Sequence, residues 1–270
     1  MRGRAADLAC LVTGSTGIGA AVAERLVAEG ASVLVASRTA DHARGLARRL
    51  ADAGGRAEWT AANLAAEADA EHAVAAVVDA FGRLDGVFSV AGGSGRGFGD
   101  GPVDRLAADA FDRTIELNLR SQVLVAGAAV RAMLGQHPRG SLRGGSGLRG
   151  SLVLVSSVLA THPVPELFGT HAYAAAKGGI EALAGVMAAT YARDGIRVNV
   201  IAPGLTETPM SARAAADPET VAFAAVKQPL VEGFVSPADV ADAAVFQLSD
   251  EARAITGQVL AVDGGWSVVP

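Results

Sequence analysis

The sequence predicts an α/β fold in which one parallel β-sheet is covered by helices on both faces. Short apolar segments rich in β-branched residues alternate with longer segments of helical periodicity along the chain. Continuous apolar strands that alternate with helices are typical of a parallel sheet buried on both sides. Because this alternation is unbroken, we predict a single doubly wound domain over residues 1–270.

Seven segments are predicted to be strands and six to be helices, since short apolar runs favour strands and a period of about 3.6 residues favours helices. The predicted strands are Leu8–Thr13, Ser32–Ser37, Arg56–Thr60, Gly86–Val90, Ser151–Ser156, Arg197–Ile201 and Gln258–Val262. The predicted helices are Gly17–Glu29, Asp41–Ala53, Ala68–Phe81, Val103–Leu134, Ala172–Ala192 and Ser236–Leu248.

Two segments depart from this alternation. Gly135–Gly150 is rich in glycine, serine and arginine, which predicts a flexible surface insertion at residues 135–150. Thr206–Gly233 follows the sixth predicted strand and contains three prolines. Ligands bind beyond the carboxyl ends of the strands in open α/β sheets, so residues 206–233 are predicted to form a substrate lid or pocket.

The overall composition excludes several classes of protein. Half of the 270 residues are apolar, the net charge is −5, and no long basic run suggests a nucleic-acid partner. The single cysteine, Cys10, rules out an internal disulfide and fits a reducing compartment. No apolar run is long enough for a signal peptide or a membrane span, and the five histidines form no metal-ligand pattern. We therefore expect a metal-free cytoplasmic protein without a membrane partner.

A glycine-rich segment follows the first predicted strand and precedes the first predicted helix. From Thr13 to Ala20 it reads Thr-Gly-Ser-Thr-Gly-Ile-Gly-Ala. Glycines allow the backbone to approach a pyrophosphate closely, and the helix N-terminus offers N–H groups and a positive dipole end to the anion. An ordinary tight turn is the alternative interpretation. This context favours a dinucleotide-binding Rossmann fold, with contacts from Gly14, Ser15, Thr16, Gly17, Ile18 and Gly19.

The end of the second predicted strand indicates which dinucleotide is bound. An NAD site usually places an acidic side chain there to bond the ribose 2′-hydroxyl, whereas an arginine suits a 2′-phosphate. Here the strand ends in Ser37 and Arg38, and a guanidinium can bond a phosphate in a bidentate way. Asp41 is the nearest acid, and we interpret it as a first-turn charge of the next helix. NADP(H) is therefore expected rather than NAD(H).

Tyr173 and Lys177 lie four residues apart at the start of a predicted helix, on one face. A lysine ammonium near a tyrosine favours the phenolate and lowers the pKa of the hydroxyl, which has an ordinary value of about 10. Such a tyrosine can exchange a proton with a carbonyl or alcohol oxygen. Ser157 follows the fifth strand and is a candidate to hydrogen-bond that oxygen, although the neighbouring Ser156 is an equal candidate from the residues alone.

Several of these motifs occur in the same order in one known family. They are the glycine loop, the lone Asn118, a serine, the Tyr173 and Lys177 pair, Asn-Val-Ile-Ala-Pro-Gly from Asn199, and Val-Asp-Gly-Gly from Val262. From about Leu8 to Trp266 the chain resembles the short-chain dehydrogenase/reductase family.

The resemblance implies a role for each matching residue. Tyr173 is implied to be the acid/base, and Lys177 to lower its pKa and bind the nicotinamide ribose. Ser157 is implied to orient the substrate, and Asn118 to hold a proton-relay water near the lysine. The implied cofactor contacts are Asn63 and Leu64 at the adenine, Ala91 and Gly92 against the cofactor, and Pro203, Gly204, Thr206 and Thr208 at the carboxamide.

The sequence departs from the family pattern at three places. Two residues rather than three separate Gly14 from Gly17 in the glycine loop. The usual Asn-Asn-Ala-Gly reads Ser-Val-Ala-Gly from Ser89 to Gly92, so an asparagine that braces neighbouring strands is missing. The longer spacing from Ser157 to Tyr173 predicts an enlarged loop beside the substrate.

Together these observations predict an NADP(H)-preferring oxidoreductase that interconverts a carbonyl and an alcohol. A non-catalytic, cofactor-sensing protein on the same fold is the alternative from another class, and transient oxidation during an epimerisation is a second. The apolar face around Val123–Val130, with Ala182–Ala189, predicts a homo-oligomer, a tetramer or a dimer. Burial of those faces against the sheet alone would leave a monomer.

Overall fold

The computed structural model describes residues 3–140 and 147–270, and in these residues it contains a seven-stranded sheet in which all neighbouring strands are parallel. The strand order is β3-β2-β1-β4-β5-β6-β7, so the chain reverses direction across the sheet between β3 and β4. The strands are β1 Ala9–Thr13, β2 Ser32–Ser37, β3 Arg56–Ala61, β4 Gly86–Ser89, β5 Gly150–Val155, β6 Ile196–Pro203 and β7 Val259–Val262. The predicted fold class is confirmed.

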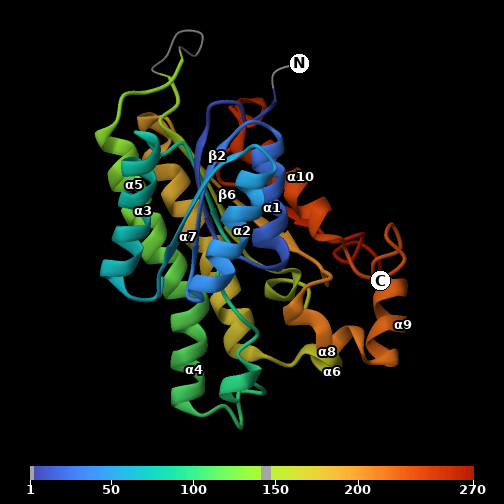
Figure 1. Ribbon diagram of the computed structural model, residues 1–270. Helices are drawn as coiled ribbons and strands as arrows, with labels where there is room; N and C mark the ends of the chain where they lie inside the picture. Colours follow the sequence, from blue (N-terminus) through green and yellow to red (C-terminus); the bar gives the residue numbers. More distant parts are fainter. Residues whose placement is uncertain (1–2, 141–146) are drawn as a thin grey trace.

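Helices cover both faces of the sheet (Figure 1). One face carries α1 Gly17–Ala28, α2 Ala40–Asp52 and α10 Pro237–Leu248, and the other carries α3 Glu67–Phe81, α5 Ser121–Gly135 and α7 His171–Tyr191. The remaining α-helices gather at the lower end of the view in Figure 1, and they are α4 Ala108–Ile115, α6 Pro165–Phe168, α8 Ala212–Ala215 and α9 Pro218–Lys227. Short 3₁₀ or π turns are η1 Arg96–Phe98, η2 Glu116–Arg120, η3 Val158–Ala160, η4 Ala192–Asp194, η5 Pro209–Ser211 and η6 Asp250–Ala252.

Two apolar cores, one on each side of the sheet, stabilise this arrangement. Successive strand residues point to opposite faces, so Leu11 packs with α3, α5 and α7 while Cys10 and Val12 pack with α1, α2 and α10. Every residue of β1, β4, β5 and β6 is buried, whereas the edge strands β3 and β7 are largely exposed. Burial raises the pKa of the Cys10 thiol, which fits a small packing residue rather than a reactive one.

The predicted helix Val103–Leu134 is divided in the structure. Residues 103–107 precede α4, and the π turn η2 separates α4 from α5. Asn118 lies in this turn, and its side chain donates to the carbonyl of Thr114, four residues earlier. A π turn widens the helix by one residue per turn, and such turns occur frequently at functional sites.

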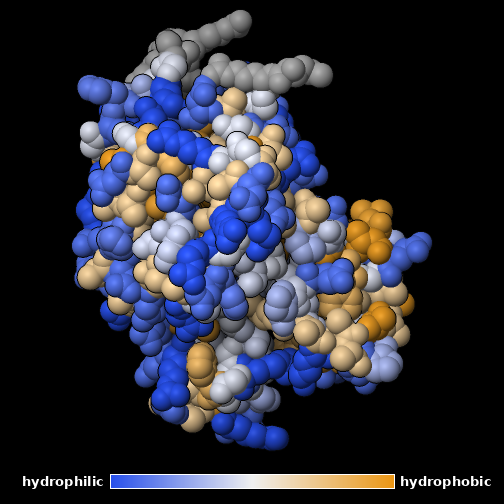
Figure 2. All heavy atoms as spheres, viewed as in Figure 1, coloured by the Kyte–Doolittle hydropathy of each residue, from blue (hydrophilic) through white to orange (hydrophobic). Residues whose placement is uncertain are grey.

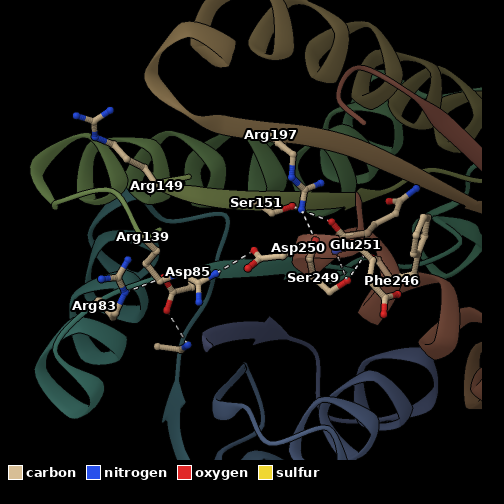
Figure 3. A network of polar contacts seen from close by, with 12 residues as sticks. Arg83, Asp85, Arg139, Arg149, Ser151, Arg197, Phe246, Ser249, Asp250 and Glu251 are labelled. Carbon is tan, nitrogen blue, oxygen red and sulfur yellow. Dashed lines mark hydrogen bonds and ion pairs between the residues drawn. The ribbon is translucent and has the colours of Figure 1, made fainter. Parts of the chain in front are cut away.

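The amino ends of the strands are joined by a polar network around Asp85 (Figure 3). The buried Asp85 carboxylate accepts from the Ala9 backbone at 3.0 Å, from Arg83 Nε at 2.7 Å, and pairs with Arg139 Nε at 3.1 Å. Arg139 also exchanges backbone hydrogen bonds of 2.7 and 3.0 Å with Leu148. Both ends of the predicted insertion 135–150 are thus tied to the sheet, and its residues 141–146 lie outside the described part of the chain.

Several large apolar side chains are exposed on the surface of the described residues. Figure 2 shows apolar side chains gathered over the α9 end of the molecule, where Val226 is 68% exposed and Leu230 is 84% exposed. Among the described residues, no helix has both the length and the apolar character that a bilayer crossing needs.

Candidate active site

A cleft opens at the carboxyl ends of the central strands, where β1, β4, β5 and β6 lead into their loops. In open α/β sheets this edge binds ligands. Fifteen of the sequence-predicted site residues line the cleft: Gly14, Thr16, Gly17, Ile18, Gly19, Ala91, Gly92, Asn118, Ser157, Tyr173, Lys177, Pro203, Gly204, Thr206 and Thr208. Five others lie outside its lining: Ser15, Ser37, Arg38, Asn63 and Leu64.

The first turns of α7 place Tyr173 and Lys177 on the floor of the cleft. The Lys177 ammonium nitrogen lies 5.4 Å from the centre of the Tyr173 ring and donates to the carbonyl of Val155 at 2.9 Å. The Ser157 hydroxyl, which comes from the loop after β5, lies near enough to the Tyr173 hydroxyl to lower its pKa. The structure therefore brings together three side chains that are separated by up to twenty residues in sequence.

The lowering of the Tyr173 pKa that the resemblance assigns to Lys177 stays a prediction, because burial dominates in this structure. Burial raises the pKa of the Tyr173 hydroxyl above its usual value, and the hydrogen bond with Ser157 opposes this rise. Burial also lowers the pKa of the Lys177 ammonium from 10.5 to about 7. Both shifts have one cause: removal from water disfavours the charged form of each group.

The structure separates the two candidate serines. Ser156 donates to the carbonyl of Lys177 at 3.1 Å and to the carboxylate of Glu181 at 2.6 Å, so its hydroxyl ties β5 to α7. Ser157 caps the turn η3 by accepting from the Leu159 backbone at 3.2 Å, and it contacts Tyr173. Of the two serines, Ser157 is the one whose hydroxyl lowers the pKa of Tyr173, whereas the Ser156 hydroxyl is engaged by α7.

Asn118 holds the loop that follows β4. Its side chain accepts from the Gly93 backbone N–H at 3.1 Å and donates to the carbonyls of Gly93 and Thr114, each at 2.9 Å. A Cβ on Gly92 would lie 2.6 Å from the Asn118 oxygen, so only glycine fits there. The proton-relay role implied for Asn118 remains a prediction, since these contacts are all with the protein itself.

In place of the missing asparagine, the Thr13 side chain joins the ends of two neighbouring strands, β1 and β4. Its hydroxyl oxygen accepts from the backbone N–H groups of Val90 and Ala91 at 2.9 and 3.1 Å, which joins the ends of β1 and β4. The unusual Val90 packs beside Gly14, where an added Cβ would lie 3.4 Å from the valine side chain. Sequence reasoning missed Thr13 because the residues it joins are 77 and 78 positions away.

Asp100 is a second residue that the sequence did not single out. The side chain is buried, and its two oxygens accept from the backbone N–H groups of Ala172 and Tyr173 at 3.0 and 2.9 Å. These are free donors in the first turn of α7, where a negative charge is also favoured by the helix dipole. A loop residue thus anchors the turn that carries the tyrosine.

The glycine loop fits the pyrophosphate of a dinucleotide. The first turn of α1 carries no acidic residue, and the side chain of its N-cap residue, Thr16, makes no capping hydrogen bond, so no side chain blocks an anion. Gly14 has φ +94°, which favours glycine. A Cβ on Gly19 would lie 2.5 Å from the Gly14 carbonyl oxygen. The loop therefore closes tightly although it is one residue shorter than expected.

The carboxyl end of β2 lies next to the glycine loop, outside the lining of the cleft. The Ser15 hydroxyl donates to that of Ser37 at 3.0 Å, which links the glycine loop to the strand tip. Arg38 is exposed and forms no hydrogen bond or ion pair with any described residue. Asp41 lies in the first turn of α2, which agrees with its interpretation as a first-turn charge, and it forms an ion pair with Arg44.

The two residues predicted to meet the adenine differ in their surroundings. Leu64 is 4% exposed and belongs to the apolar core, while Asn63 is exposed. The Asn63 backbone N–H donates to the Asp69 carboxylate at 2.7 Å.

The segment after β6, residues 206–233, forms one wall of the cleft. The buried Gln228 accepts from the Leu205 backbone at 2.7 Å, and a Cβ on Gly204 would lie 2.2 Å from the same Gln228 oxygen. Thr208 caps the turn η5 through a reciprocal hydrogen-bond pair with Ser211. The helices α8 and α9 in this segment were not predicted.

Large apolar side chains complete the cleft. Phe168 and Met210 both line it and supply an apolar wall. Trp266 joins them from the end of the chain, packed at 6.0 Å between ring centres on Phe168 and at 5.4 Å on Phe223. The tryptophan was not predicted, because nothing local to its segment indicates that it returns to the cleft.

Comparison with known proteins agrees with this arrangement. A family model described as enoyl-(acyl carrier protein) reductase matches residues 12–267. The chain is 36% identical over 269 residues to a cis-4-hydroxycyclohexanecarboxylate dehydrogenase of Sinomonas cyclohexanicum, covering 98% of each protein.

Solved structures show the same likeness. A short-chain type dehydrogenase/reductase from Mycobacterium ulcerans is 34% identical, with a TM-score of 0.86 over 98% of this chain and 91% of that one. A gluconate 5-dehydrogenase from Burkholderia cenocepacia, in complex with NADP and tartrate, is 28% identical, with a TM-score of 0.84 over 97% of this chain and 95% of that one.

The family match extends over nearly the whole chain, and the relatives are named as enzymes, which gives no support to the non-catalytic alternative. The chain belongs to the short-chain dehydrogenase/reductase family and is an oxidoreductase that transfers a hydride between a nicotinamide cofactor and an alcohol or carbonyl compound.

Proposed function

We propose that the protein is an NADP(H)-preferring carbonyl reductase or alcohol dehydrogenase in which Tyr173 moves the proton. The observation that carries this proposal is the grouping of Ser157, Tyr173 and Lys177 in the cleft, where Ser157 lowers the pKa of the tyrosine and Lys177 lies one helical turn away. No acidic side chain is among the residues that line the cleft, so Tyr173 is the group best placed to protonate a substrate oxygen.

The bound nicotinamide supplies the hydride in the reducing direction and accepts it in the other. Ser157 donates a hydrogen bond to the substrate oxygen and holds it next to Tyr173, which protonates it as negative charge develops. The Tyr173 hydroxyl is protonated at neutral pH, since burial raises its pKa, so it has a proton to donate. A protonated Lys177 stabilises the phenolate that remains. Asn118 keeps the loop after β4 in place beside these groups.

Replacing Tyr173 by phenylalanine tests the proton-transfer role. We expect the turnover number to fall by at least about a hundredfold, because general acid–base catalysis contributes on the order of 10²–10⁴. Binding of NADPH, measured by fluorescence, should be retained. Tyr191→Phe, at the far end of α7, is the matched control and should keep its activity. Unchanged turnover in Tyr173→Phe would refute the role.

The preference for NADP(H) rests on the tip of β2. Arg38 is exposed there, has no partner among the described residues, and follows Ser37 where an NAD enzyme would have an acid. Asp41 is engaged by Arg44 and does not compensate. The NADP complex of the Burkholderia gluconate 5-dehydrogenase shows that a structural relative accepts this cofactor.

A fluorescence titration of the purified protein with NADPH and then NADH tests the preference. We expect tighter binding of NADPH, and we expect Arg38→Leu to remove most of the difference. Arg48→Leu is the control, since Arg48 is an exposed arginine on α2 with an (i, i+4) carboxylate partner. Equal or tighter binding of NADH to the wild type would overturn the preference and leave the oxidoreductase assignment standing.

The proposed substrate is a secondary alcohol or ketone on an apolar ring. Phe168, Met210 and Trp266 form the apolar wall that such a ring would contact. The cis-4-hydroxycyclohexanecarboxylate dehydrogenase, 36% identical, is named for a ring alcohol. Consistent with this, product analysis should show net oxidation of the alcohol to the ketone, with one cofactor reduced for each substrate consumed.

A further inference from the structure

The charged residues that line the cleft are all cations. They are Arg96, Lys177 and Arg213, and no aspartate or glutamate is among the lining residues. The chain as a whole carries a net charge of −5. The cleft is therefore positively charged although the chain as a whole is negatively charged, which indicates a negatively charged ligand.

Lys177 is already accounted for by its buried position and its hydrogen bond to Val155. The two arginines, by contrast, have no role in the reaction described above. Arg96 lies in the turn η1 after β4, and Arg213 lies in α8 of the excursion after β6. The two residues reach the cleft from segments that follow different strands, β4 and β6, which flank β5 in the sheet.

The Arg96 backbone is held in place. The preceding Gly95 has φ +71°, and a Cβ there would lie 2.6 Å from the Thr114 hydroxyl oxygen. The Arg96 guanidinium donates to the carbonyl of Leu167 at 3.0 Å and forms no ion pair with any described residue. The nearby Asp100 carboxylate is engaged by the first turn of α7, so most donors of Arg96 remain available.

Arg213 makes no hydrogen bond or ion pair with any of the described residues. The Asp217 carboxylate, whose pKa Arg213 helps to lower, caps α9 by accepting from the backbone N–H and hydroxyl of Thr220. Both guanidinium groups line the cleft, and they act on each other: burial lowers the pKa of Arg96, Arg213 lowers it further, and Asp100 opposes this. Two unpaired cations that repel each other are stabilised when one anion binds both.

We propose that Arg96 and Arg213 bind a carboxylate of the substrate, so that the preferred substrate is a hydroxy or oxo acid whose apolar body lies against Phe168, Met210 and Trp266. This inference rests on the proposed carbonyl reductase function. A guanidinium matches a carboxylate in a bidentate way, and the apolar wall beside the pair fits the carbon frame. The carboxylate then fixes which face and which end of the ring reaches Ser157 and Tyr173.

The first test compares the reduction of 4-oxocyclohexanecarboxylate and of its methyl ester by NADPH. Reduction as such tests the proposed function, and the preference for the acid tests the carboxylate site. We expect the wild type to prefer the acid in kcat/KM by at least about tenfold. Arg96→Gln and Arg213→Gln should each raise KM for the acid by about fivefold, and the double variant by about 25-fold, with a much smaller effect on the ester. Arg253→Gln, an exposed arginine near the opposite edge of the sheet, controls for the change in net charge.

Binding of cyclohexanecarboxylate and cyclohexanecarboxamide to the protein–NADP⁺ complex, measured by calorimetry, needs no turnover. Tighter binding of the carboxylate, lost in the double variant, is the expected result. Equal binding of the two probes would overturn the inference, as would an equal loss of activity on acid and ester. A weaker affinity of the double variant for NADPH itself would assign the arginines to the cofactor instead. Selective carboxylate binding without reduction of either ketone would instead contradict the proposed function alone.

Discussion

Lys177 illustrates what burial does to a single catalytic residue. The side chain is 3% exposed and its ammonium has one carbonyl partner, so the charged form loses most of its hydration. Its pKa falls to about 7, which places the loss of its proton in the neutral range. The lysine can therefore change its charge near neutral pH, beside a tyrosine whose own pKa is raised.

This depressed pKa predicts a pH dependence of stability. Between about pH 7 and the unfolded pKa near 10.4, the unfolded state binds a proton that the folded state does not, so the free energy of unfolding rises with pH. The rise attributable to Lys177 is at most about 1.4 kcal/mol per pH unit. Below about pH 7 both states bind the proton, so Lys177 no longer makes the free energy of unfolding depend on pH.

Urea unfolding of the cofactor-free protein at pH 7.5 and 9.5 measures the effect. Lys177→Met should gain less stability between the two pH values than the wild type, because the variant has no buried amine to deprotonate. Lys227→Met, which removes the only other lysine, is the control. An identical pH response in the wild type and in Lys177→Met would show that the lysine pKa is not depressed.

At the scale of an element, α7 depends on a residue from a distant loop. Asp100 satisfies two N–H donors in the first turn of the helix, beside Tyr173. Loss of a helix N-cap acceptor costs about 0.5–2 kcal/mol in stability. The same loss also loosens the turn that positions the tyrosine relative to Ser157.

We expect Asp100→Ala to lower the free energy of unfolding by about 1–2 kcal/mol and to lower kcat more than it raises KM. Asp100→Asn keeps one acceptor oxygen and should restore part of both. Asp104→Ala, at an exposed aspartate paired with Arg105 in the same loop, is the matched control. Urea unfolding and steady-state kinetics measure these effects, and a kcat equal to that of the control would remove Asp100 from the positioning of α7.

At the scale of the whole molecule, part of the predicted oligomer face remains uncovered. Val123 of α5 is 39% exposed and Val186 of α7 is 68% exposed, with Ala182 and Ala189 exposed beside the latter. Other residues of the predicted face, such as Val125, are buried in the core beneath. An exposed apolar stripe on two neighbouring helices favours association with a second copy, which supports the proposed dimer or tetramer.

Light scattering of the wild type and of Val186→Arg tests this proposal. The wild type should have the mass of a dimer or tetramer, and the arginine should lower it by placing a charge in the interface. Ala51→Arg, on the exposed face of α2, is the control and should keep the wild-type mass. A monomeric wild type would sink the proposal, and a mass lowered instead by Leu230→Arg would move the interface to the α9 end.

Local patterns determined much of what this protein is. The seven strands and most of the helices could be predicted because hydrophobic periodicity and glycine positions act over a few residues. The pairing of Tyr173 with Lys177 follows in the same way from the helical repeat. The long helix predicted from Val103 failed at η2, where the side chain of Asn118 competes for backbone partners.

Only the tertiary structure decided which distant groups meet at the carboxyl ends of the strands. It distinguished Ser157 from Ser156, brought Asp100 to α7 and Thr13 to the loop after β4, and placed Arg96 and Arg213 on one cleft. It also showed that burial raises the pKa of Tyr173. Burial, close approach and desolvation depend on how the whole chain packs, and no short stretch of sequence contains them.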